Sequence, residues 1–152
     1  MTSTTPQYAT VERVFGASRE QVFRAWTDPA DIAAWYGPAH MHVPADLVRV
    51  DARPGGRWEL TMVPDGGGEG FAIGYDIVEL VEPELLVMRS DPMPQLGMPD
   101  GTTVRIEFEE HAGQTRMTLT DGPMPCDGSG RATAGYEAAL SKLADRLTAT
   151  RQ

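Results

Sequence analysis

The strongest constraint on the fold is a succession of short segments in which apolar and polar residues alternate. This pattern runs through Arg57–Met62, Thr103–Glu109 and Arg116–Thr120, and glycine-rich or polar turns such as Asp65–Gly68 separate the segments. A strand with period-two alternation buries one face and exposes the other, and short turns join neighbouring strands in antiparallel order. The middle of the chain therefore predicts an antiparallel meander with one apolar face.

Helical patterns lie on either side of this meander. Ser18, followed three residues later by Gln21, fits a capping box, and Asp28-Pro29 fits the start of a second short helix. Towards the end of the chain, apolar residues recur at spacings of three and four between Tyr136 and Leu147. This periodicity predicts a long C-terminal helix over about 130–149.

These elements predict one architecture for the whole chain. With 152 residues, it is expected to form a single α+β domain over 1–152, with about 1–6 as a frayed N-terminus. The order is one strand, two short helices, further strands and the long helix, so a curved antiparallel sheet of about seven strands should wrap around that helix. Because a helix is only about 10 Å across, part of the concave face should remain as a cavity.

Charge and composition exclude several classes of partner. The net charge is -9, and the 13 Lys and Arg residues are scattered singly, so we expect neither nucleic acid nor a membrane surface as a partner. No apolar run approaches the roughly 20 residues of a membrane span, and the first residues lack a signal-peptide pattern. The single cysteine, Cys126, cannot form an internal disulfide. A cytoplasmic protein is expected.

Several motifs, in this order and spacing, resemble the activator-of-Hsp90-ATPase-like (AHSA1-type) branch of the START/SRPBCC helix-grip superfamily. The resemblance covers the chain from about residue 9 to residue 147. The motifs are Val14–Ser18, Trp26–Pro29, Trp35–Pro38, Arg53–Trp58, Glu82–Val87, Thr103–Phe108, Thr115–Thr120 and Gly135–Leu143.

The resemblance implies a curved antiparallel sheet that grips the C-terminal helix around an apolar pocket. Members of the superfamily include lipid carriers, hormone receptors, aromatase/cyclases and resistance proteins that take up a toxic ligand, so the fold does not fix the function. The second Trp of the family's Trp-Trp-Gly-Pro motif is Tyr36 here, which adds a hydroxyl group to the expected pocket mouth. Hsp90-type chaperone contact is not expected, because the activator makes major contacts through an additional N-terminal domain.

Aromatic and methionine side chains supply the predicted ligand site. Eight methionines is a high count for this length, and thioethers adapt to variable apolar ligands while rings stack on flat ones. For any one of these residues, packing in the core is the simpler interpretation, but the set favours a pocket. The predicted ligand-binding residues are Trp35, Tyr36, Trp58, Met62, Phe71, Tyr75, Met88, Met93, Phe108, Met117, Met124, Tyr136 and Leu140.

Other chemistries have weaker support. His40 and His42 lack a third metal ligand at a recognisable spacing, and Cys126 lacks the sequence context of a nucleophile. The glycine-rich segment Asp65–Gly70 lacks the Lys-Ser/Thr pair of a phosphate loop. We therefore expect no metal, no cofactor and no assigned catalytic residue. The polar strand residues Glu59, Asp76 and Arg105 should face solvent, unless a bulge turns one inward to orient a ligand or act as an acid or base.

Three functions stay open. The first is binding of a small apolar or aromatic metabolite that enters beside Trp35-Tyr36 and the loop around Met93–Met98. The second is a cyclase-, aromatase- or hydrolase-like enzyme acting on an aromatic or polyketide-type substrate, including a resistance role by ligand sequestration. The third is a protein-interaction module like the Hsp90 activator. A homodimer is also left open.

Overall fold

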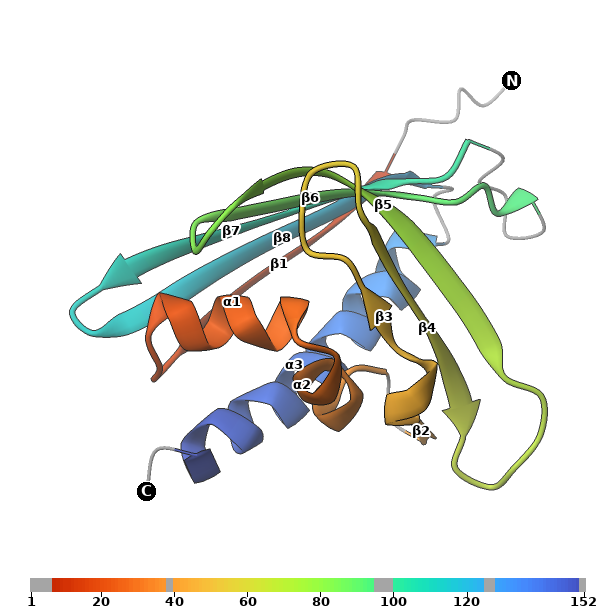
Figure 1. The fold of residues 1–152 in the computed structure, drawn as a ribbon, viewed down its shortest axis with the longest axis horizontal. Helices are drawn as coiled ribbons and strands as arrows, with labels where there is room; N and C mark the ends of the chain where they lie inside the picture. Colours follow the sequence, from red (N-terminus) through yellow and green to blue (C-terminus); the bar gives the residue numbers. More distant parts are fainter. Residues whose placement is uncertain (1–6, 38–39, 95–99, 125–127, 151–152) are drawn as a thin grey trace.

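The chain folds as a curved antiparallel sheet whose concave side carries the helices (Figure 1). A computed structural model describes residues 7–37, 40–94, 100–124 and 128–150. The strands are β1 (Gln7–Phe15), β2 (Met41–His42), β3 (Arg49–Val50), β4 (Arg57–Pro64), β5 (Phe71–Val81), β6 (Leu85–Ser90), β7 (Thr103–His111) and β8 (Gln114–Met124). The helices are α1 (Arg19–Thr27), α2 (Pro29–Trp35) and α3 (Gly128–Thr150), with a 3-10 turn η1 (Ala45–Leu47).

The sheet combines a meander with one long-range pairing. Its strand order is β1-β8-β7-β6-β5-β4-β2, and β3 pairs with β4 as a side branch. Strands β4 to β8 follow one another along the chain and across the sheet, each antiparallel to the next. The first strand returns to pair with the last, β1 with β8. The predicted α+β helix-grip architecture is therefore confirmed.

Local sequence signals determine where the first two helices begin. Ser18 Oγ accepts a hydrogen bond from the backbone N–H of Gln21 at 3.2 Å, and the Gln21 side chain accepts one from the backbone N–H of Ser18 at 3.2 Å. The next helix begins after Asp28, whose Oδ1 accepts from the backbone N–H groups of Ala30 at 2.9 Å and Asp31 at 3.3 Å. Both predicted helix starts are confirmed.

Helix α3 includes the whole predicted range and lies closest to β1, β8 and α2. Two polar contacts fix it: Arg13 Nη1 donates to Ser141 Oγ at 3.1 Å, and Arg146 Nη2 donates to Asp31 Oδ1 at 2.7 Å. In Figure 1 the β4–β5 hairpin extends away from this helix. Helix α3 therefore covers mainly the β1 side of the concave face. Side chains from other elements cover the β4–β5 side.

An aromatic cluster fills much of this second side. Trp26, Trp35, Tyr36, Trp58 and Tyr75 contact one another, mostly edge to face, with ring centroids 4.8–6.4 Å apart. The indole N–H of Trp58 donates to the backbone oxygen of Trp26 at 2.7 Å. Buried indoles normally find such a partner, so these tryptophans are well satisfied as core residues.

Two segments of the sheet differ from what their local sequence suggests. The segment Leu47–Val50 has strand-like residues but contains the end of η1 and the two-residue strand β3. Strand β8 continues through Asp121 to Met124. Asp121-Gly122-Pro123 has the composition of a turn, but β1 and β7 pair with this segment from both sides, and pairing overrides the local preference.

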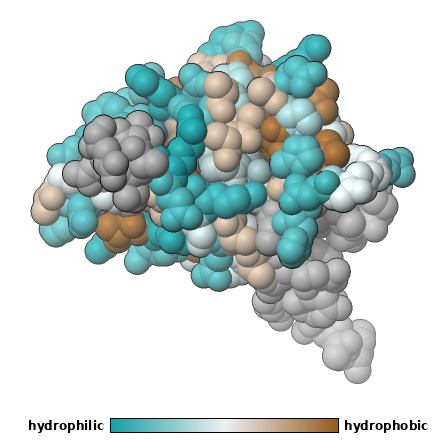
Figure 2. Space-filling view, turned by 90° about the horizontal axis from the view of Figure 1, so that it is seen from below, coloured by the Kyte–Doolittle hydropathy of each residue, from teal (hydrophilic) through white to brown (hydrophobic). Residues whose placement is uncertain are grey.

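Most of the surface in view is polar. Figure 2 shows one face on which hydrophilic residues predominate and hydrophobic ones are scattered in small groups. Among the ranges that the structure describes, no helix combines the length and apolar composition that crossing a membrane requires.

Candidate functional site

A buried carboxyl group interrupts the apolar inner face of the sheet near the end of β8. Met117 and Leu119 point inward and are fully buried, and the same alternation turns Asp121 inward, where it is 6% exposed. Its cross-strand neighbours are Val104 on β7 and Ala9 on β1, both buried and apolar. Asp121 thus lies inside the grip, with its charge removed from water.

The two oxygens of Asp121 have different surroundings. Tyr136 on α3 donates its hydroxyl to Oδ2 at 2.7 Å. Oδ1 is buried and has no hydrogen-bond partner among the described residues, although the Thr102 side chain lies beside the carboxyl group. Thr102 is held in place by Ser90, whose Oγ accepts from the Thr102 backbone N–H at 2.7 Å. One acceptor position on Asp121 is therefore left open.

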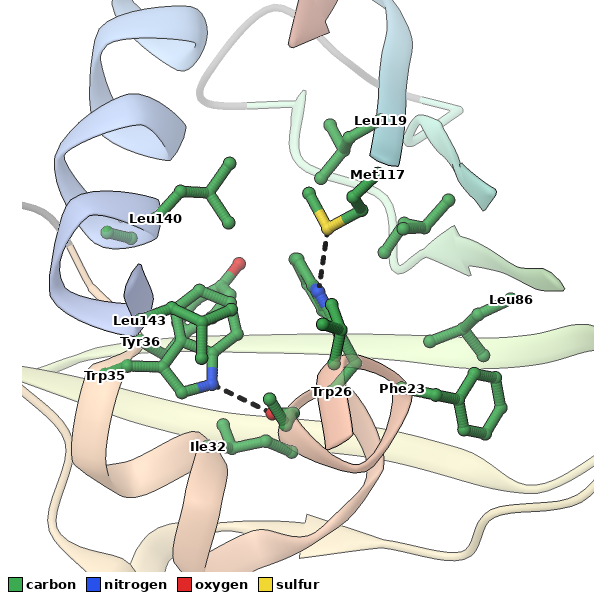
Figure 3. Packing of buried hydrophobic residues seen from close by; sticks show 14 of the residues in the cluster. Phe23, Trp26, Ile32, Trp35, Tyr36, Leu86, Met117, Leu119, Leu140 and Leu143 are labelled. Atoms are coloured by element: carbon green, nitrogen blue, oxygen red, sulfur yellow. Dashed lines mark hydrogen bonds between the residues drawn. The ribbon is translucent and has the colours of Figure 1, made fainter. Parts of the chain in front are cut away.

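Three tyrosines from three different elements meet at this carboxyl group. Tyr36 follows the last residue of α2, Tyr75 lies on β5 and Tyr136 on α3. The hydroxyl of Tyr75 interacts with those of both Tyr36 and Tyr136. Figure 3 shows the Tyr36 hydroxyl pointing into the space between α3 and the strand that carries Met117. The hydroxyl groups thus form a chain that ends at Asp121.

Burial determines the protonation of this Asp121 cluster, which we define as Tyr36, Tyr75, Tyr136 and Asp121. Burial raises the pKa of the Asp121 carboxyl, and the nearby hydroxyl groups of Thr102 and Tyr136 partly offset the shift. Burial also raises the pKa of all three tyrosines, and the nearby Asp121 charge raises it further. The tyrosines consequently stay protonated as donors, while Asp121 can accept a hydrogen bond or hold a proton.

The other residues of the predicted ligand site divide into three groups. Six belong to the packed core and are at most 2% exposed: Trp35, Trp58, Met88, Phe108, Met117 and Leu140. Met62 packs partly buried against this core and Met93 is half-buried, whereas Phe71 opens β5 and is 38% exposed, away from the cluster. The Met124 side chain, Cys126 and most of the Met93–Met98 loop lie outside the described residues. The structure thus brings together three of the predicted residues, all tyrosines, around a carboxyl group.

Residues 16–148 match the family described as activator of Hsp90 ATPase homolog 1-like protein. The chain belongs to this AHSA1-like family. Its sheet and C-terminal helix are those of the SRPBCC helix-grip superfamily. No curated protein matches the sequence.

Solved structures of similar proteins share the fold of this AHSA1-like chain. A crystal structure of a protein from Chromobacterium violaceum is 22% identical, with a TM-score of 0.81 over 93% of this chain and 98% of that chain. The AHSA1 protein from Silicibacter pomeroyi is 25% identical, with a TM-score of 0.76 over 95% and 99%. An AHSA1-like protein from Aeromonas hydrophila is 22% identical, with a TM-score of 0.74 over 90% and 92%.

The AHSA1-like chain leaves open space beside Gly135, next to Tyr136 on α3. A Cβ atom added at Gly135 would meet no atom of the described chain within 4 Å. Gly135 lies two turns before Lys142, whose Nζ donates to the backbone oxygen of Met41 at 3.5 Å. Residues seven apart lie on one side of a helix, so the open space is on the flank of α3 that faces β2.

The convex face has its own polar centre at Arg57. Arg57 donates to both oxygens of Asp91, at 2.8 and 2.9 Å, and to Asp76 and Glu59, each at 3.1 Å. This group borders a surface hollow of about 330 Å³. Glu59 and Asp76 therefore lie on the outer face, as expected. Because carboxylates already accept the hydrogen bonds of Arg57, these ion pairs serve to hold the segment after β6 against β4.

A second hollow and the histidines add no chemistry to this picture. A hollow of about 540 Å³ lies near the start of β6 and the end of β7, and Phe108 is the one predicted site residue in its lining. His42 pairs with Asp65 at 2.8 Å on the surface. Within the described ranges, no three His, Cys, Asp or Glu side chains are grouped to hold a metal ion.

Sequence reasoning missed Asp121 and its neighbours Ser90 and Thr102. A signal for Asp121 was present in the alternation of this strand. Met117 and Leu119 are apolar residues of its inner face, and Asp121, two residues later, falls on the same face. The following glycine and proline hid this signal, since they are typical of a turn. No pattern in the sequence marked Ser90 or Thr102.

Proposed function

We propose that this AHSA1-like domain binds a small apolar or aromatic molecule between α3 and the concave face of the sheet, with the Asp121 cluster orienting its polar end. The observation that carries the proposal is a chain of three tyrosine hydroxyls that ends at one buried carboxyl group. Ligand sites in proteins are typically apolar surfaces with a few polar groups at defined positions.

The cost of this cluster argues against a purely structural role. A buried carboxyl group loses its hydration, and replacing buried charges by apolar side chains is often neutral or stabilising. Apolar residues at the position of Asp121 would continue the inner row of β8, where Met117 and Leu119 are fully buried. A polar cluster in this position is thus better explained by binding than by stability.

Access to the cluster is proposed along α3 at Gly135 and Tyr136. Oδ1 of Asp121 is shielded from water, so a ligand must displace side-chain atoms to reach it. Tyr36 and Tyr75 are buried, whereas Tyr136 is only partly buried and directly follows Gly135, beside which there is open space. The polar face in Figure 2, with its scattered hydrophobic groups, favours a small molecule over a broad apolar docking surface on that side.

A paired substitution on α3 tests this proposal. Gly135→Leu should fill the open space and block uptake of an apolar aromatic probe, 2-methoxynaphthalene, while helix propensity favours the variant by up to about 1 kcal/mol. The matched control is Ala134→Leu, since Ala134 is exposed on the adjacent side. NMR titration of the methyl signals of Leu140 and Leu143 measures binding.

Saturable binding to the wild type and to the control, with loss in Gly135→Leu, supports the proposal. Native mass spectrometry of protein purified from its own host adds a direct measurement, because a co-purifying apolar compound is expected. A protein that is isolated empty and shows no saturable binding would refute a small-molecule site.

A second candidate function is acid–base catalysis on the same bound molecule. The observation that favours it is the raised pKa of the Asp121 carboxyl beside a chain of hydroxyl groups, since catalytic acids and bases are often tuned by burial. Conversion of a bound aromatic compound that disappears in Asp121→Asn would support catalysis. Binding without conversion would leave the binding function alone.

A further inference from the structure

We propose that the ligand of this domain presents a hydrogen-bond donor, a hydroxyl or an amine, to Oδ1 of Asp121. This inference rests on the proposed function and specifies the ligand chemistry at the same site. It is carried by the geometry of one carboxyl group, whose two oxygens are unequally satisfied.

The acceptor capacity of Asp121 exceeds what the protein supplies. An ionised carboxylate can accept about four hydrogen bonds, and buried polar atoms in native proteins almost always have at least one partner. Tyr136 satisfies Oδ2 at 2.7 Å, while Oδ1 has no hydrogen bond from the described chain. For the ionised carboxylate the missing group is therefore a donor, and a ligand that supplies it offsets the cost of the unsatisfied buried oxygen.

The surrounding charges argue against an anionic ligand. Asp121 is the acidic group inside the cluster, while Lys142 on α3 and Arg13 on β1 donate to the backbone oxygen of Met41 and to Ser141 Oγ. A ligand carboxylate or phosphate would meet the Asp121 charge in a medium that screens poorly. A neutral hydroxyl or a cationic amine meets it favourably.

The residues around Asp121 also indicate the chemistry of the rest of the ligand. The cross-strand neighbours of Asp121 are Val104 and Ala9, and the tyrosine rings lead to Trp58, 5.3 Å from Tyr36 and 5.4 Å from Tyr75 between ring centroids. These surfaces accept apolar and aromatic groups. The inferred ligand is an aromatic or apolar molecule with a donor at one end.

Matched ligands test the inference without any substitution. The probes are 2-naphthol, which has a hydroxyl donor; 2-(aminomethyl)naphthalene, which has an ammonium donor; and 2-methoxynaphthalene, which has none. Isothermal titration at neutral pH should show roughly 10- to 100-fold tighter binding of at least one donor ligand than of the ether, as expected for a hydrogen bond to a buried carboxylate. Which donor gains more identifies a hydroxyl or an amine ligand.

A variant assigns the preference to Asp121. Asp121→Leu replaces both acceptor oxygens by methyl groups on a side chain with the same branching and should reduce the preference to about threefold or less. Asp145→Leu is the matched control, because Asp145 is exposed on α3, and it should keep the wild-type preference. Circular dichroism confirms that each variant is folded.

The outcomes separate this inference from the proposed function. Equal binding of the ether and both donor ligands by the wild type overturns the donor requirement and leaves the binding function standing. A preference that persists in folded Asp121→Leu also overturns it, because the donor is then recognised elsewhere. Absence of saturable binding for all three probes refutes the binding function itself.

Discussion

Tyr136→Phe isolates the contribution of one hydroxyl group to the Asp121 cluster. The ring stays, while the hydrogen bond to Asp121 Oδ2, 2.7 Å long in the wild type, is lost. A hydrogen bond to a charged group contributes about 1.5–3 kcal/mol, and here its loss leaves a second buried oxygen without a partner. For a chain of this size, the melting temperature should fall by roughly 3–12 °C.

The loss should depend on pH in a defined direction. The Asp121 carboxyl has a raised pKa in the folded protein, so stability is highest below the unfolded pKa of about 3.9 and falls as pH rises through the folded pKa. The Tyr136 hydrogen bond lowers that pKa, so the Phe variant has a still higher one and loses more stability. The difference between variant and wild type should be smallest near pH 4 and grow towards pH 8.

Urea unfolding at several pH values between 4 and 8 measures this difference. Tyr8→Phe is the matched control, because the Tyr8 side chain is 57% exposed and its hydroxyl should contribute less than about 0.5 kcal/mol. In an Asp121→Asn background the pH dependence should disappear. A Tyr136→Phe loss that equals the Tyr8→Phe loss, or that stays constant with pH, would show that the hydroxyl does not stabilise the ionised carboxyl group.

Two further substitutions test the scaffold around the site. Asp28→Ala should lower the free energy of unfolding by about 1 kcal/mol, because its side chain caps two N–H groups at the start of α2, whereas Asp28→Ser should restore most of it. Gly74→Ala places a Cβ atom against Arg57 and within 2.7 Å of Asp91 Oδ2, which separates that ion pair. The free energy of unfolding should change by less than about 1 kcal/mol. The loss of a half-exposed ion pair is offset because Ala loses less conformational entropy than Gly when the strand folds. The pKa of Asp91, which the hydrogen bonds from Arg57 hold below its usual value, should rise in an NMR titration; an unchanged pKa would contradict this account.

Local chemistry explains which parts of the fold were predictable. The helix starts depend on neighbours within three residues, such as Ser18 with Gln21, and the strands on period-two alternation. The inward position of Asp121 depends on pairing with β1, more than a hundred residues earlier in the chain. Such pairing leaves no local mark, so the turn-like composition after Leu119 hides the continuation of the strand.

The candidate site was predictable in composition but not in geometry. Aromatic rings serve equally in a core and in a ligand pocket, and the sequence could not separate the two uses. The structure distinguishes the two uses by the hydrogen-bond partners of the polar atoms on these rings. Trp35 on α2 donates its indole N–H to the backbone oxygen of Ala25 on α1 at 2.8 Å, which satisfies a core side chain, whereas Tyr136 donates to a buried carboxyl group on β8.

The pairing of β1 with β8 has a consequence for folding during synthesis. The ribosome synthesises β1 long before β8, its neighbour in the sheet. The pairing of β1 with β8 can therefore form only after almost the whole polypeptide has emerged. Nascent chains that stall before about residue 124 would expose an unpaired strand, which is the kind of intermediate that chaperones bind.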